Sequence, residues 1–249
     1  MKKRHSAMNL LHRLSGDRAA LLLDAHPPPS DTARTIKNDK LTYLSEEKLS
    51  RLEVLARLVD ERTVPGAFVE FGVALGGSSI LLAKLAQVRS RTFAGFDVFD
   101  MIPAPTSEFD DAATMSRYEA IKSGQSKGID GDTYYGYRSD LLAEVESSFR
   151  RHGLDPNGAD VSLHKGLFAD TWPTRGPKSV ALAHIDCDWY DPVAFCLGAT
   201  HQAGSQGSII VLDDYFAWSG CREAADQFLA AHRGQYRVHY GENVVLIRR

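Results

Sequence analysis

The sequence predicts an α/β fold of the Rossmann-like type, with a mostly parallel twisted sheet and helices on both faces. From residue 65 onward, short continuous apolar runs alternate with amphipathic helical patterns, which is typical of parallel strands buried on both sides. Acidic residues come directly after several of these runs, at the ends of strands where ligands bind in such sheets. Near the end of the chain, two apolar segments flank residues 241–243, which predicts an antiparallel C-terminal hairpin strand at one sheet edge.

The first 40 residues are expected to form an N-terminal helical arm or lid on the main body. Pro27-Pro28-Pro29 cannot continue a helix and separates most of this arm from the rest of the chain. Ser45 is the expected N-cap of a helix over 46–60, because the leucines of that segment recur on one helical face. Residues 41–249 then form a single domain.

The other elements of this domain are predicted from the alternating apolar runs and helical patterns. Strands are expected at 67–71, 92–96, 161–164, 180–185 and 208–212, with helices at 77–87, 192–201 and 222–232. Residues 101–160 are too long for an ordinary connection between two strands, so we expect an insertion there. It contains two predicted helices, at about 111–122 and about 139–152.

Composition and charge argue against several classes of protein. The chain has 249 residues with 29 basic and 32 acidic side chains, so no basic surplus indicates a nucleic-acid partner. No stretch approaches the roughly 20 apolar residues of a membrane span, and the basic N-terminus lacks the apolar segment of a secretory signal. The three cysteines lack metal-site spacing. We therefore expect a cytoplasmic protein that has no membrane partner.

A glycine-rich turn comes after the first strand. Glu70 and Gly72 end the strand, and Gly76, Gly77 and Ser78 open the next helix. This spacing differs from the Gly-x-Gly-x-x-Gly pattern that cradles a pyrophosphate. Glu70 would disfavour a phosphate and favour an amine or a ribose. The glycines alone fit a purely structural turn equally well.

Two further strand ends predict a nucleoside site. Asp97 ends the second strand, 25 residues after Gly72, where an acid commonly accepts hydrogen bonds from ribose hydroxyls. Gly166 comes after the third strand and would let a flat ring approach the backbone. A solvated loop acid is the alternative reading of Asp97, but the coincidence of these features favours nucleoside binding.

The strongest signal is a set of carboxylates after the fourth and fifth strands. Asp186 comes after one strand, and Asp213 and Asp214 come after the other. If the strands are neighbours, these side chains converge and repel one another unless they are protonated or neutralised by a cation. All-oxygen ligands suit Mg²⁺, Mn²⁺ or Ca²⁺. Helix capping is the structural alternative, and we expect it for Asp191, which precedes a proline.

The ordered set of motifs along residues 41–249 resembles the macrocin O-methyltransferase family. The motifs are Glu70-x-Gly72-x-x-x-Gly76-Gly77, Gly95-Phe96-Asp97-x-Phe99-Asp100, Lys165-Gly166-x-Phe168-x-Asp170-Thr171, Asp186-x-Asp188-Trp189-Tyr190, and Asp213-Asp214-Tyr215 with Gly220-Cys221-Arg222. Enzymes of this family methylate sugar hydroxyls on glycosylated natural products such as macrolide and aminocoumarin antibiotics. The resemblance implies a Rossmann-like methyltransferase fold, S-adenosylmethionine and a divalent cation, usually Mg²⁺.

The resemblance also assigns roles to individual residues. The implied cofactor-binding residues are Glu70, Gly72, Gly76 and Ser78 at the methionine end and ribose, Asp97 at the ribose hydroxyls, and Gly166, Leu167 and Phe168 at the adenine. The implied metal ligands are Asp186, Asp213 and Asp214. A small-molecule glycoside is the implied acceptor, and a homodimer or larger homo-oligomer is the implied assembly.

The general base is expected to be an aspartate. The spacing between the implied metal ligands Asp186 and Asp213 is similar to that in catechol O-methyltransferases. Those enzymes carry a lysine three positions after the residue that corresponds to Asp186, where this chain has Trp189. Asp186 is the first candidate and Asp188 the second. Trp189 and Tyr215 are candidates for the aromatic side chains that face the sulfonium of the methyl donor.

Three alternative functions remain open at this level. A metal-dependent catechol or phenol O-methyltransferase would need less activation of its acceptor oxygen, because a phenol ionises near pH 10. An NAD-dependent dehydrogenase is disfavoured by the glycine spacing and by the absence of a Tyr-x-x-x-Lys pair. A non-catalytic nucleoside-binding or scaffold protein is disfavoured by the acidic strand ends.

Overall fold

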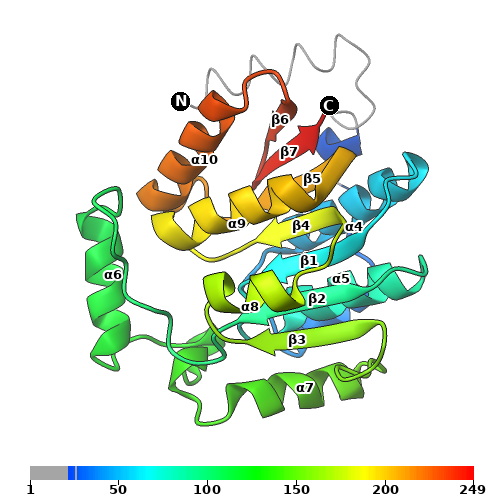
Figure 1. The fold of residues 1–249 in the computed structure, drawn as a ribbon. Helices are drawn as coiled ribbons and strands as arrows, with labels where there is room; N and C mark the ends of the chain where they lie inside the picture. Colours follow the sequence, from blue (N-terminus) through cyan, green and yellow to red (C-terminus); the bar gives the residue numbers. More distant parts are fainter. Residues whose placement is uncertain (1–21, 26) are drawn as a thin grey trace.

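A seven-stranded sheet in the order β3-β2-β1-β4-β5-β7-β6 forms the centre of the computed structural model, which describes residues 22–25 and 27–249 (Figure 1). The strands are β1 (Ala67–Phe71), β2 (Phe93–Asp97), β3 (Val161–Lys165), β4 (Val180–Ile185), β5 (Gly204–Leu212), β6 (Tyr236–Tyr240) and β7 (Val244–Arg248). Strands β1 to β5 pair in parallel, whereas β7 runs antiparallel between β5 and β6. The predicted Rossmann-like sheet with an antiparallel C-terminal hairpin is confirmed.

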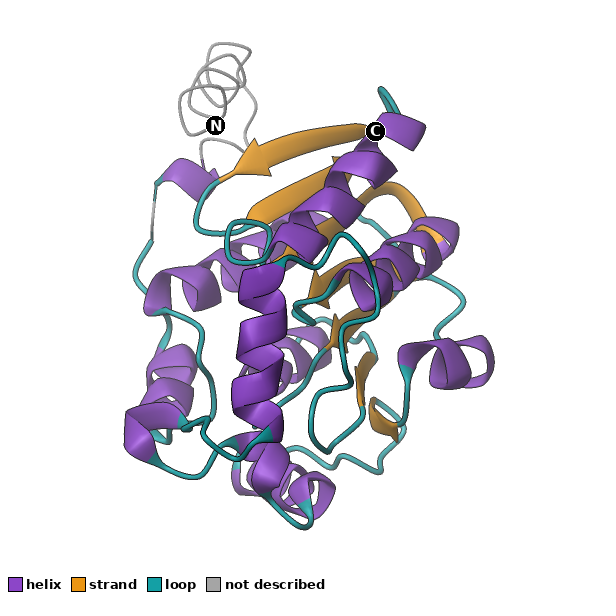
Figure 2. Cartoon of the chain, turned by 90° about the vertical axis from the view of Figure 1, so that its left-hand side faces the viewer, coloured by secondary structure: helices purple, strands orange, loops and turns teal. Residues whose placement is uncertain are grey.

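Helices cover both faces of the sheet (Figures 1 and 2). One face carries α3 (Asp31–Asn38), α4 (Glu46–Glu61), α5 (Gly77–Gln87) and α7 (Leu141–Arg151), and the other carries α8 (Phe168–Arg175), α9 (Tyr190–Ala203) and α10 (Ser219–Ala231). Successive strand residues point to opposite faces, so they enter two separate cores. Phe68 and Leu182 pack in the core under α4 and α5, while Val69 and Ala183 pack under α9 and α10.

Most predicted elements are found within a few residues of their expected positions. The bounds of β1, α5 and β4 are the predicted ones, and Ser45 caps α4 by accepting a hydrogen bond from the Lys48 amide. The sequence pattern missed α8, which is short and interrupted by Pro173. Asp191 is not an N-cap: it lies in the first turn of α9 and accepts a 2.5 Å hydrogen bond from Thr106 Oγ1.

The stretch 101–160 divides into two parts with different relations to the sheet. Its first helix, α6 (Ala112–Lys122), stands away from the strands (Figure 1). Its second predicted helix is α7, which buries Val145 and Phe149 in the same core as α4 and α5. The helix α7 is therefore the ordinary crossover between β2 and β3, and the added part is α6 with the turns beside it.

The part of the N-terminal arm that the structure describes is joined to the main body. Leu23, Ala33 and Ile36 are fully buried in the core under α4 and α5. Residues 1–21 of the predicted helical arm, and residue 26, lie outside the described residues. Among the described helices, none has the length and apolarity needed to cross a lipid bilayer.

Candidate functional site

A cavity of about 370 Å³ opens beyond the carboxyl ends of the central strands. Six of the predicted site residues line it, namely Gly72, Asp97, Leu167, Phe168, Asp186 and Asp188. Much of the remaining wall is apolar or aromatic and includes Val98, Ile102, Pro103, Tyr135, Trp189, Pro192 and Phe195. Its volume falls within the range of small-molecule sites, and this mixture of a few acids with flat apolar walls fits a nucleoside-sized ligand.

Asp97 is the last residue of β2 and lies between the loops that follow β1 and β2. Its carboxylate accepts hydrogen bonds from the backbone amides of Val73 at 2.7 Å, Ala74 at 3.0 Å and Phe99 at 2.6 Å. Burial raises the pKa of this carboxyl, and the three amides oppose that rise. Ala74 and Phe99 have positive φ angles of 46° and 47°, so both loops bend sharply around the carboxylate. Asp97 therefore ties two strand ends together at one end of the cavity.

The glycine-rich turn has structural reasons for its small residues. At Gly72, with φ 92°, a Cβ atom would stand 1.8 Å from the carbonyl oxygen of Asp186. Gly76 adopts a left-handed φ of 89° as the N-cap of α5, against Val145. Ser78 is buried and is not part of the cavity wall. Of the residues predicted in this turn to bind cofactor, only Gly72 borders the cavity.

The third strand contributes through the residues after it. Gly166 has φ 145°, and Leu167 and Phe168 behind it line the cavity. Leu167 is 50% exposed, whereas Phe168 packs edge-on against Phe71 at a centroid distance of 5.4 Å. A turn with two apolar side chains therefore lies where the resemblance implies the adenine border, and the role itself stays a prediction.

Glu70, expected at the cofactor, is not among the residues that line the cavity. Its side chain is completely buried on the α4 and α5 face of β1. One carboxylate oxygen accepts a hydrogen bond from the hydroxyl of Ser79, and the other lies 2.7 Å from His184 Nδ1. The parallel register between β1 and β4 sets Glu70 directly beside His184. Glu70 therefore belongs to a polar network inside the protein.

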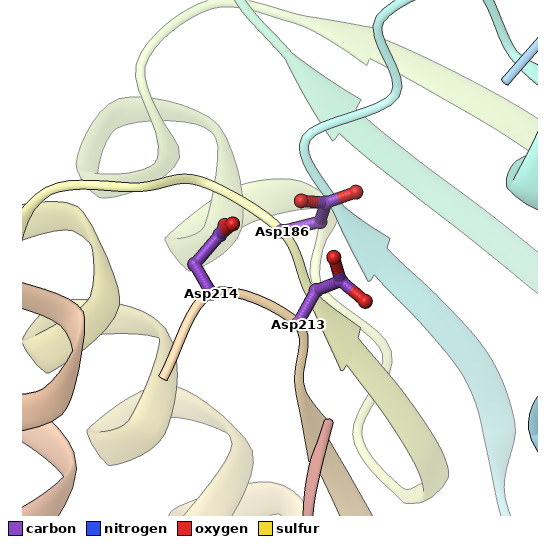
Figure 3. Close-up of side chains that lie close together, drawn as sticks. All are labelled: Asp186, Asp213 and Asp214. Carbon is purple, nitrogen blue, oxygen red and sulfur yellow. The ribbon is translucent and has the colours of Figure 1, made fainter. Parts of the chain in front are cut away.

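Asp186, Asp213 and Asp214 converge as predicted (Figure 3). One oxygen from each carboxylate lies within 4.8 Å of the others. Burial, and then the neighbouring carboxylates, raise the pKa values of Asp186 and Asp214 well above their ordinary range. For Asp213, burial is outweighed by His184 and Lys48, which hold its pKa below its ordinary value. A set of buried carboxylates with this much mutual repulsion fits a hard divalent cation.

Lys48 is the residue of this site that the sequence pattern did not indicate. It lies in the first turn of α4, and its Nζ donates a 2.6 Å hydrogen bond to Asp213 Oδ2. Burial alone would lower the pKa of Lys48, but Asp213 and the two neighbouring acids raise it. No motif or spacing connects residues 48 and 213, so only the packing of α4 on the sheet brings them together.

His184 lies in β4 and is completely buried, as expected for a histidine within an apolar strand. Its Nε2 lies 3.8 Å from Asp213 Oδ1, on the opposite side of the ring from Glu70. Burial lowers the pKa of His184, but its acidic neighbours Asp213 and Glu70 outweigh burial and raise the pKa to about 10.

Asp188 and Trp189 line the cavity close to Asp186. Asp188 has a strained φ of 60°, and its amide donates a 3.3 Å hydrogen bond to Asp214 Oδ2. Burial and the charge of Asp186 raise the pKa of Asp188 to about 7.

Trp189 donates from Nε1 to the carbonyl of Pro103 at 3.0 Å, which fixes the insertion against the site. Tyr215 is buried, donates to Asp226 at 2.8 Å and does not line the cavity.

Comparisons with known proteins agree on one class of enzyme. The macrocin O-methyltransferase family (TylF) matches residues 26–239. A demethyldecarbamoylnovobiocin O-methyltransferase of Streptomyces niveus is 28% identical over 190 residues, which cover 73% of this chain and 66% of that protein. An 8-demethyl-8-(2,3-dimethoxy-alpha-L-rhamnosyl)-tetracenomycin-C 4'-O-methyltransferase of Streptomyces olivaceus is 26% identical over 197 residues, which cover 79% of this chain and 69% of that protein.

These two matches span 66% and 69% of the length of the curated relatives, which is about two thirds. Among solved structures, the O-methyltransferase NovP superposes with a TM-score of 0.65 at 22% sequence identity. The superposition covers 92% of this chain and 99% of the other. It shows that the two proteins share a fold.

Proposed function

We propose that this chain, which belongs to the macrocin O-methyltransferase family, transfers a methyl group from S-adenosylmethionine to a sugar hydroxyl of a glycosylated natural product of the antibiotic type. A divalent cation, Mg²⁺ or another such as Mn²⁺ or Ca²⁺, is part of the proposal. One observation carries it: a nucleoside-sized cavity that contains Asp97 meets the acid cluster at Asp186, which belongs to both. The names of the two curated relatives support an antibiotic-type acceptor, and one of them names a rhamnosyl group.

The cavity fits the adenosine part of the methyl donor. Asp97 lies where ribose hydroxyls are bound in folds of this topology, and Val98 and Leu167 offer apolar surfaces for a flat ring. The donor is cationic at its sulfonium, and the aromatic face of Trp189 in the same wall would favour that charge.

The acid cluster fits a hard divalent ion. Asp186, Asp213 and Asp214 would hold it, because their oxygens converge and repel one another in its absence. When bound, the ion would lower the pKa of the acceptor hydroxyl and restrict its orientation.

Asp188 is the residue that we assign as general base. A neutral sugar hydroxyl is a weak nucleophile, so its proton must leave as the oxygen–methyl bond forms and the sulfur–methyl bond breaks. Asp188 lines the cavity beside the cluster and is not one of the three converging acids. We therefore propose the reverse of the order expected from the sequence, because Asp186 would be engaged as a ligand of the ion.

We also propose a cytoplasmic homodimer or larger homo-oligomer. The family resemblance supports the assembly, and the buried free thiols of Cys187, Cys196 and Cys221 are compatible with a reducing compartment. Light scattering on the purified chain would test the assembly.

The proposed activity is tested by mixing the purified chain with S-adenosylmethionine, Mg²⁺ and a panel of demethylated glycosides. We expect mass spectrometry to detect one added methyl group on the sugar of at least one glycoside, and chelation with EDTA to stop the transfer. A catechol belongs in the same panel as the competing acceptor. Transfer to the catechol with none to any glycoside would contradict the sugar assignment, and full activity in EDTA would contradict the cation.

A further inference from the structure

A row of charged side chains lies beneath the acid cluster, and the proposed reaction leaves its purpose unexplained. Glu70 in β1 pairs with His184 in β4, and His184 pairs with Val211 in β5. Asp213 stands two residues beyond Val211 and therefore points to the same face of the sheet. The row ends at Lys48, which reaches Asp213 from α4. All of these groups lie on the α4 and α5 face.

The contacts of His184 define how its ring is held. Nδ1 lies 2.7 Å from Glu70 Oε1, and Glu70 is held in turn by the hydroxyl of Ser79. Nε2 faces Asp213 Oδ1 at 3.8 Å, and neither of these two buried atoms has a hydrogen-bond partner in the described part of the chain. Two buried polar atoms without partners therefore face each other beside the acid cluster.

This arrangement acts on the orientation of Asp213. Lys48 takes one carboxylate oxygen and His184 faces the other, so the side chain has a neighbour on both sides. A carboxylate offers about four lone-pair sites, so Asp213 can accept from Lys48, face His184 and still bind an ion.

We propose that His184, held in place by Glu70, is a positioning residue that sets the carboxylate of Asp213 for the divalent cation. The inference rests on the proposed function, because it takes the acid cluster as a cation site. Partners that lie behind metal ligands commonly change metal affinity about 10- to 100-fold when they are removed.

Two substitutions distinguish the contact of the His184 ring with Glu70 from its contact with Asp213. The amide of asparagine stands at the position of Nδ1, so His184→Asn keeps the contact with Glu70 and loses the donor toward Asp213. The amide of glutamine stands at the position of Nε2, so His184→Gln keeps that donor and loses Glu70. We expect His184→Asn to raise the dissociation constant for Mn²⁺ about 10-fold or more, and His184→Gln to raise it less than about 3-fold.

The measurement uses the full chain and Mn²⁺ alone, with the free ion counted by electron paramagnetic resonance. Adenosylhomocysteine affinity, measured in parallel, is expected to stay within about 2-fold for both variants, because it reports on the cavity and not on the cluster. His201→Asn is the matched control, since that ring lies in the last turn of α9, at the end of the helix away from the loop that carries Asp186, and contacts the hydroxyl of Tyr236 at 2.8 Å. It should leave Mn²⁺ affinity unchanged.

Glu70→Gln provides a second variant that keeps the shape of the network should His184→Asn not fold. We expect Mn²⁺ affinity to fall about 2- to 3-fold in Glu70→Gln, as in His184→Gln, because both variants keep the donor toward Asp213 and lose only the carboxylate that holds it. The double variant should bind no more weakly than His184→Asn. Additive losses, wild-type affinity in His184→Asn, or equal losses in His184→Asn and His184→Gln would overturn the inference. A wild-type chain that binds no Mn²⁺ would overturn the cation site as well, and so distinguishes the two failures.

Discussion

The two ends of the cavity hold acids of the same type in opposite circumstances. At the Asp97 end, one buried carboxylate accepts three backbone amide hydrogen bonds, from Val73, Ala74 and Phe99. At the Asp186 end, three carboxylates face one another, and Asp213 alone among them contacts basic side chains in the described chain. An aspartate after a strand does not by itself indicate a metal. The number of donors that the protein provides decides whether a cation is needed.

The difference between the Asp97 end and the Asp186 end of the cavity is tested most strongly by Asp186→Asn. The change removes one ligand and one charge from the cluster, so we expect turnover to fall at least about 1,000-fold and Mn²⁺ binding to be lost. Adenosylhomocysteine affinity should change less than about 3-fold, as measured by calorimetry. Asp31→Asn, at a side chain that is 97% exposed, is the control. Wild-type turnover in Asp186→Asn would remove the basis for the cluster.

A substitution at Asp188 should separate chemistry from binding. We expect Asp188→Asn to lower kcat about 100- to 1,000-fold, because the acceptor proton loses its base. Affinities for Mn²⁺ and adenosylhomocysteine should both remain close to wild type, since the side chain belongs to neither set of ligands. A loss of Mn²⁺ binding equal to that of Asp186→Asn would instead place Asp188 among the ligands.

Asp97→Asn should give the reverse of the Asp186 pattern. The asparagine amide has one acceptor oxygen in place of two, so a buried backbone amide is left without a partner at a cost of about 1–3 kcal/mol. We expect adenosylhomocysteine affinity to fall about 10- to 100-fold, which calorimetry would measure, and Mn²⁺ affinity to stay unchanged. Weakened Mn²⁺ binding would show that the two ends are not independent.

The smallest effect is expected between the two ends, at Trp189. Trp189→Phe keeps an aromatic ring in the wall and removes the hydrogen bond to Pro103, which is worth about 1 kcal/mol. We expect thermal unfolding to shift down by about 2–4 °C, with both affinities within about 3-fold of wild type. A large loss of adenosylhomocysteine affinity would show that the indole itself contacts the donor.

Some of the site could be predicted from the sequence because its signals are local. The apolar runs of β1, β4 and β5 identify buried strands, and the acids after them mark the carboxyl edge. The strand order then brings Asp186 to Asp213 and Asp214, since β4 and β5 are neighbours. Local periodicity and turn chemistry were sufficient to predict the strands and the acids after them, whereas the adjacency of β4 and β5 came from the structure.

The sequence by itself determined which residues form strands and helices and which acids stand at strand ends, because apolar periodicity depends on neighbours along the chain. Only the tertiary structure decided the partners. The register of β1 on β4 turned Glu70 toward His184 and away from the cavity, and the packing of α4 brought Lys48 to Asp213. Contacts between such distant positions depend on strand order and helix packing, which leave no periodic mark in the sequence.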